Sequence, residues 1–160
     1  MLHRRLVTYE WRCHAYCLMG THFHLIVQTI GPSLSRGMHA LCGSYAQWFN
    51  KRHDRKGHLF GRRFLAVAIE SDRHLRAAHR YVALNPERAG LCKRASTWRW
   101  GSYRGILDLD APEAFVDVGG VLELYDDRPA VARELFRRFV EEPTPGELAE
   151  VYKLAEIDGA

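Results

Sequence analysis

The sequence predicts an α+β protein, in which a β-hairpin is followed by several helices. Residues 11–19 and 22–29 alternate in the manner of strands, and Gly20-Thr21 between them is a candidate tight turn. Farther along, residues 33–52 and 71–85 carry apolar side chains at the spacing of amphipathic helices.

The first half of the chain divides into elements at recognisable start signals. Residues 1–11 look like the end of a helix that runs into the first strand. Gly31-Pro32 then ends the second strand, and Ser33 or Ser35 can cap a helix that extends to about Arg52. The core stripe expected along this helix comprises Met38, Leu41, Tyr45, Trp48 and Phe49.

The second half begins with a further strand at residues 63–69. Ser71 opens the next helix, and Asp72 in its first turn suits the helix dipole. Because Pro86 disfavours helical geometry at the preceding residue, we expect this helix to end at Asn85. Three helical stretches are expected after the Pro112 linker, at residues 118–125, 129–141 and 147–156.

Charge divides the chain into two predicted domains. Residues 1–104 hold 18 of the 23 Lys and Arg residues but only 5 of the 19 Asp and Glu residues, a net charge of +13. Residues 105–160 carry −9. This asymmetry predicts a polyanion-binding body at 1–104 and an acidic helical extension at 105–160, whose simplest interpretation is a solvated helical surface.

Composition indicates a globular protein of the cytoplasm. Of the 160 residues, 47% are apolar, yet no apolar run approaches the roughly 20 residues needed to span a bilayer. The N-terminus lacks the apolar stretch of a secretory signal. The four cysteines show no zinc-binding spacing, and a reducing compartment suits them best.

The most informative motif is His22-Phe23-His24 at the start of the second strand. Alternate side chains of a strand share a face, so the two imidazoles would lie side by side as a pair of metal ligands. An amphipathic edge strand that happens to carry two histidines is the simpler alternative.

A second motif lies downstream, where Tyr81 and Asn85 are one helical turn apart. A tyrosine hydroxyl is a weak nucleophile unless a base or nearby positive charge activates it, and Arg80 is adjacent. An amide oxygen could complete a cation site with two imidazoles without adding negative charge. The alternatives are a half-buried core tyrosine and an ordinary helix-terminal asparagine.

Together these motifs resemble the HUH-endonuclease superfamily, specifically the single-tyrosine transposases and their REP-associated branch. The resemblance covers about residues 11–104, through segments 16–25, 45–50, 57–60, 69–72, 80–91 and 98–103. It implies a small antiparallel sheet flanked by helices, of the ferredoxin-like type. It also implies metal-assisted cleavage and rejoining of single-stranded DNA through a covalent 5′-phosphotyrosine.

The resemblance assigns roles to individual residues. His22 and His24 match the histidine pair, Tyr81 the nucleophile and Asn85 the third ligand of Mg²⁺ or Mn²⁺. The chain departs from the family pattern at Gly20-Thr21, where Pro-Asn is usual, and at Gly61, where the usual glutamine is lacking. It also starts beyond the family's first strand, so we expect an N-terminally truncated domain.

Basic and aromatic residues predict how DNA would be held. The predicted backbone contacts are Lys51, Arg52, Arg55, Lys56, Arg62, Arg63 and Arg80. Trp98, Trp100 and Tyr103 are candidates for base stacking, although core packing is the more common role of such residues.

Three functions remain open at this point. The first is an enzyme that nicks and transfers single-stranded, hairpin-bearing DNA, alone or as a homodimer. The second is a catalytically inactive, truncated or domesticated transposase that only binds hairpin DNA. The third, a structural or RNA-binding domain, requires the combined motifs to be coincidental.

Overall fold

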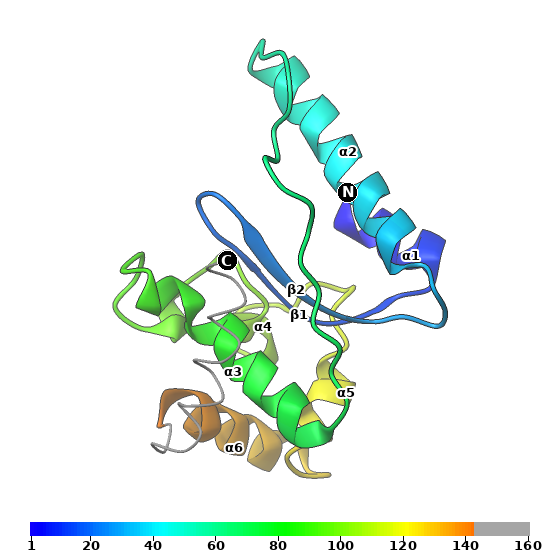
Figure 1. Cartoon of the computed structure of the whole chain (residues 1–160). Coiled ribbons are helices and arrows are strands. Elements are labelled where there is room, and N and C mark those ends of the chain that lie inside the picture. Colours follow the sequence, from blue (N-terminus) through cyan, green and yellow to red (C-terminus); the bar gives the residue numbers. More distant parts are fainter. Residues whose placement is uncertain (143–160) are drawn as a thin grey trace. The chain divides into compact units, whose positions relative to one another are not determined.

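In the computed structural model, which describes residues 1–142, helix α1 (Leu2–Tyr9) leads into a two-stranded antiparallel sheet (Figure 1). The sheet consists of β1 (Arg12–Leu18) and β2 (Phe23–Gln28), followed by the long helices α2 (Leu34–Arg52) and α3 (Asp72–Arg88). The remaining elements are the short 3-10 helix η1 (Ala95–Thr97), α4 (Tyr103–Ile106), α5 (Val118–Leu122) and α6 (Pro129–Glu141). The protein is therefore α+β, as the sequence predicts.

These elements form two units, each of which is described by itself. The first unit contains residues 1–12 and 28–66, and hence α1 and α2. The second contains residues 13–27 together with the described residues from 67 onward, and hence most of the hairpin, α3 and the later helices. This division differs from the predicted boundary at residue 104, because the chain enters the second unit, leaves it and returns.

The hairpin closes as expected around Gly20-Thr21, where the Met19 amide donates to the His22 carbonyl at 2.9 Å. The other edge of β1 is covered by the segment that follows η1. The Leu18 amide donates to Trp100 at 2.8 Å, and the Ser102 amide donates to Tyr16 at 2.9 Å. Covering this edge satisfies backbone groups that a two-stranded sheet would otherwise expose.

In the first unit, α1 packs on the N-terminal half of α2. The Trp11 ring covers Gly37, where a side chain would overlap it, and Trp11 Nε1 donates to Ser33 Oγ at 2.9 Å. Met38 and Leu41 are consequently buried. The predicted core stripe does not continue, however, because Tyr45 and Trp48 in the second half of α2 are exposed.

Helix α3 begins as predicted, with the Ser71 hydroxyl accepting a hydrogen bond from the His74 amide at 3.2 Å. The predicted end at Asn85 is wrong, because the helix continues through Pro86 to Arg88. In the last turn proline costs little more than one hydrogen bond. The chain recovers bonding immediately, since the amides of Ala89 and Leu91 donate to the carbonyls of Asn85 and Pro86.

The strand predicted at residues 63–69 is not formed. In the described part of the chain this segment pairs with no other strand. A run of apolar residues is therefore insufficient, because a strand also needs a neighbour for its backbone hydrogen bonds. The exposed apolar residues of this segment are Phe64, Leu65, Val67 and Ile69.

The described part of the acidic extension, residues 105–142, contributes to a buried core and is not only a solvated surface. Residues from α4, α5 and α6 share one core with Ala83 of α3. The prediction of a helix at 129–141 is confirmed, and the one at 118–125 is shorter, at Val118–Leu122. The helix predicted at 147–156 lies outside the described residues. This core includes Ile106, Val121, Ala132, Phe136 and Val140.

None of the helices in residues 1–142 is long and apolar enough to cross a membrane. The cysteines Cys13, Cys17, Cys42 and Cys92 are free thiols, and the first two are buried. Burial raises the pKa of Cys13 and of Cys17 to about 12, which keeps both as neutral core side chains.

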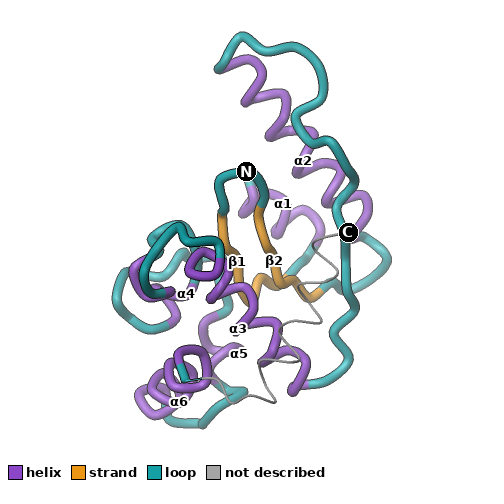
Figure 2. Tube along the Cα trace, turned by 60° about the vertical axis from the view of Figure 1, so that its left-hand side comes forward, coloured by secondary structure: helices purple, strands orange, loops and turns teal. Residues whose placement is uncertain are grey.

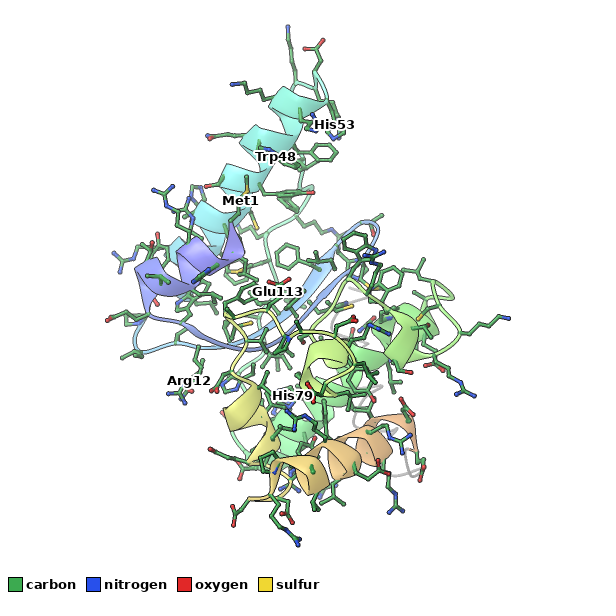
Figure 3. All side chains as sticks on the ribbon, turned by 180° about the vertical axis from the view of Figure 1, so that it is seen from behind. Met1, Arg12, Trp48, His53, His79 and Glu113 are labelled. Atoms are coloured by element: carbon green, nitrogen blue, oxygen red, sulfur yellow. The ribbon has the colours of Figure 1, made fainter. Side chains whose placement is uncertain are left out.

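A buried histidine lies between α3 and α6 (Figure 3). His79 is 1% exposed, with its ring centre 6.1 Å from that of Phe136 and 6.4 Å from that of His14. Within the described residues neither of its ring nitrogens has a hydrogen-bond partner. Burial lowers the pKa of His79 to about 3, and the neighbouring His14 acts in the same direction.

We therefore expect acid to destabilise the fold through His79. Because its folded pKa lies below the value of about 6.5 in an unfolded chain, its contribution is complete above that pH and falls toward pH 3. One such group costs up to about 1.4 kcal/mol per pH unit. Urea unfolding across this range should show a smaller pH dependence for His79→Leu than for wild type. The matched exposed variant His39→Leu should behave as wild type, and equal slopes for all three proteins would contradict the assignment.

Candidate active site

The inner face of the hairpin packs against α3, and Tyr81 belongs to the core that the two elements share (Figure 2). Alanine and cysteine side chains on this face of β1 are small, so α3 can approach the sheet closely. Ile26 of β2 is buried on the same face, two residues beyond His24. The shared core comprises Ala15, Cys17, Ile26, Ala78, Tyr81 and Val82.

His24 of β2 and His22, just before this strand, lie side by side, as predicted. His22 Nε2 is 3.1 Å from His24 Nε2, and His22 Nδ1 is 3.1 Å from Thr21 Oγ1. In the tautomer that donates Nδ1–H to this hydroxyl, Nε2 of His22 accepts the hydrogen bond from His24 Nε2, and a cation would bind there in place of that hydrogen bond. His24 is buried and His22 is exposed, so the pair lies at the boundary between core and solvent.

Tyr81 packs directly against this pair. Its ring lies edge-to-face with His24, with centres 5.4 Å apart. The Arg88 guanidinium lies 5.9 Å from the centre of the Tyr81 ring. Arg88 is not among the residues predicted from the sequence, although a spacing of seven residues places it on the same helix face as Tyr81.

Asn85 is held one turn beyond Tyr81, where its Nδ2 donates to the Tyr81 carbonyl at 3.1 Å. This bond uses the nitrogen and leaves Oδ1 as the atom that can bind a cation. Among residues 1–142, no group of three His, Cys, Asp or Glu residues could hold a metal. A cation bound by the histidine pair would therefore need a third ligand of another type, and the amide oxygen of Asn85 is the one predicted from the sequence.

The separation of the two imidazole nitrogens is suitable for metal binding. Ligand atoms bound about 2.1 Å from one ion and at right angles to each other are about 3 Å apart, close to the separation of the two Nε2 atoms. Imidazoles favour transition ions over Mg²⁺, so this donor set suits Mn²⁺ better.

The family model for IS200-like transposases matches residues 1–85, slightly more than half of the chain. This chain belongs to the IS200-like transposase family. Comparison with curated proteins and with solved structures gives no match. The matched range contains both histidines, Tyr81 and Asn85. Membership associates the protein with DNA and with the reactions of transposition.

One residue that we expected to contact DNA in this transposase is instead buried. Arg80 is 1% exposed, its Nε donates to the Phe139 carbonyl at 2.6 Å, and its Nη2 donates to the same oxygen. Its guanidinium carbon lies 3.5 Å from the centre of the Phe139 ring. Arg80 therefore joins α3 to the C-terminal end of α6, and this structure does not support its predicted roles in DNA contact and tyrosine activation.

The other predicted DNA contacts are at the surface. They belong to the first unit, whereas the histidines, Tyr81 and Asn85 all belong to the second. The exposed residues are Lys51, Arg52, Arg55, Lys56, Arg62 and Arg63.

The three aromatic residues after α3 have different environments. Trp98 packs on the site core, and its Nε1 donates to the Leu18 carbonyl at 3.2 Å. Tyr103 is buried against Glu141, and burial followed by this carboxylate raises the pKa of Tyr103. Only Trp100 among the three is well exposed, with the Arg99 guanidinium 5.3 Å from its ring centre. Core packing thus accounts for Trp98 and Tyr103.

Proposed function

We propose that this transposase-family protein nicks single-stranded, hairpin-bearing DNA and becomes joined to it through Tyr81. The observation that carries the proposal is the packing of Tyr81 against His24 of the histidine pair. This contact brings a nucleophile and two potential metal ligands from distant parts of the sequence into one place.

In the proposed reaction, the Tyr81 oxygen attacks a phosphorus atom of the DNA. A phosphorus–oxygen bond forms, the bond to the 3′ oxygen breaks, and the strand upstream leaves with a free 3′ hydroxyl. The tyrosine proton is lost to solvent, and the leaving oxygen takes up a proton. A divalent ion, held by His22, His24 and Asn85 when bound, would neutralise charge on the phosphate.

The protein's own residues position these groups. The sheet holds the histidine pair, and the contact with His24 limits movement of the Tyr81 ring. The guanidinium of Arg88 lies over the Tyr81 ring and supplies positive charge close to the phenol. The bond from Asn85 to the helix backbone restrains its side chain.

Labelling the DNA at one end or the other, and measuring which label stays attached to the protein, tests this proposal. Hairpin DNA labelled at its 3′ end should migrate with the protein on a denaturing gel in the presence of Mn²⁺. DNA labelled at its 5′ end should be released as a shorter strand. Retention of the 5′ label, or no covalent complex with either label, would contradict a 5′-phosphotyrosine.

A second function, hairpin binding without cleavage, is favoured by the burial of Tyr81. This side chain is 8% exposed, and the adjacent Arg80 points into the α6 interface. A phosphate would have to displace part of the packing around the ring to reach the hydroxyl. In that case the protein would retard hairpin DNA on a native gel yet give no covalent complex.

A further inference from the structure

The second half of α2 carries an exposed group of aromatic rings, which we name the α2 aromatic surface. Tyr45 is 39% exposed and Trp48 is 47% exposed, and Figure 3 shows Trp48 and His53 along this helix. The Tyr45 ring centre lies 5.7 Å from that of Trp48, 6.0 Å from that of Phe49 and 6.1 Å from that of Phe60. Burying such rings is ordinarily favourable, so their exposure on one face indicates a binding surface.

The same end of α2 is strongly basic. The loop after the helix folds back onto it, because Asn50 Nδ2 donates to the Gly57 carbonyl at 2.8 Å and the Arg55 amide donates to the Asn50 carbonyl at 2.9 Å. Gly57 has a φ of 92°, which favours glycine in this turn. The Arg55 guanidinium consequently lies 5.8 Å from the centre of the Phe49 ring. Positive groups and aromatic rings are therefore neighbours on one surface.

The charge of the first unit identifies the kind of partner. Its residues 1–12 and 28–66 contain 10 Lys and Arg residues but only Glu10 and Asp54 as acids, a net charge of +8. A second copy would bring two such positive surfaces together, which repulsion opposes. A polyanion with exposed flat groups matches both the charge and the rings. Bases of a duplex are stacked on one another, whereas unpaired bases have faces available for aromatic side chains.

We infer that the α2 aromatic surface stacks unpaired bases of single-stranded DNA, with Tyr45 and Trp48 as the stacking rings. Lys51, Arg52 and Arg55 contact the flanking phosphates. This inference deepens the proposed function and rests on it for the identity of the ligand. It assigns base contact to Tyr45 and Trp48, which the sequence pattern predicted to be core residues. Trp98 and Tyr103, which were candidates for stacking, instead pack in or against the core.

The test compares a short oligothymidine with an abasic oligomer of the same length, using fluorescence anisotropy and the full chain. Stacking contributes roughly 1–3 kcal/mol per base, so Trp48→Ala should weaken binding of oligothymidine by about 5- to 140-fold. Trp48→Phe keeps a ring and should recover most of this loss. The slope of affinity against salt should not change, because no phosphate contact is removed.

The abasic oligomer provides the decisive comparison. Wild type and Trp48→Ala should bind it equally, since it offers phosphates without bases. Val7→Ala removes a comparably exposed apolar side chain from α1 and should match wild type on both oligomers. The double variant Arg52→Ala with Arg55→Ala should lower the salt slope on both.

Several outcomes would overturn the inference. An equal loss on both oligomers would make Trp48 structural, and no loss on oligothymidine would exclude stacking. If Trp48→Ala instead dissociates a dimer in sedimentation without changing DNA affinity, a second copy occupies the surface. If wild type binds neither oligomer, both the inference and the proposed function are wrong, because each requires DNA binding. If it binds as described but forms no covalent complex, the inference stands and the proposed cleavage is wrong.

Discussion

Replacing Tyr81 by Phe should abolish the covalent protein–DNA complex while leaving hairpin binding close to wild type. Phenylalanine keeps the ring that packs against His24 within the core of the second unit and removes only the attacking oxygen. The fold should therefore persist, with a Tm close to that of wild type. A native gel measures binding, and a denaturing gel measures the covalent complex.

The control for this experiment is the same change at two other tyrosines that lie in segments resembling the family. Tyr45→Phe and Tyr16→Phe should both retain the covalent complex. Burial, followed by the charge of Glu113, raises the pKa of Tyr16 to about 12, which makes its hydroxyl a poor nucleophile. A complex that survives Tyr81→Phe but disappears in Tyr45→Phe would show that the nucleophile is misassigned.

Removing both imidazoles in His22→Ala with His24→Ala should eliminate Mn²⁺ binding measured by calorimetry. The two Nε2 atoms supply two of the three proposed ligands, and the Asn85 oxygen alone would bind the ion weakly. Since a bound ion contributes several kcal/mol of charge stabilisation, cleavage should fall by at least about 100-fold.

In the matched control, two exposed histidines outside the site are replaced. His39→Ala with His58→Ala also removes two imidazoles, so adventitious binding should fall equally in both double variants. We expect the control to keep the wild-type Mn²⁺ affinity. If the His22 and His24 variant keeps it as well, the histidine pair is not a metal site.

Short-range patterns in the sequence predicted most of what surrounds the site. Strand alternation was sufficient to place His22 beside His24, because that relation depends only on local backbone geometry. The cap at Ser71 and the spacing of Tyr81 and Asn85 likewise depend on a single helix. The contact between His24 and Tyr81 joins residues far apart in the chain, so no local pattern specifies it, and it followed only from treating the two motifs as parts of one site.

Features that depend on tertiary packing were predicted less well. The sequence alone suggests that Arg80 is a surface cation. In the structure α6 packs beside α3, and the Phe139 carbonyl accepts hydrogen bonds from Arg80. The stripe on α2 is uniformly apolar, but α1 is only eight residues long and packs near the start of α2. Periodicity alone cannot reveal where such a covering element stops, so Tyr45 and Trp48 were assigned to the core.

Mass spectrometry of the covalent complex, after nuclease and trypsin digestion, identifies the residue that is joined to DNA. Cleavage after Arg80 and Arg88 releases the peptide at residues 81–88, in which Tyr81 is the only tyrosine. If Tyr81 is the nucleophile, this peptide carries the mass of the residual phosphonucleotide. A nucleotide found instead on the peptide at residues 37–51, which contains Tyr45, would contradict it.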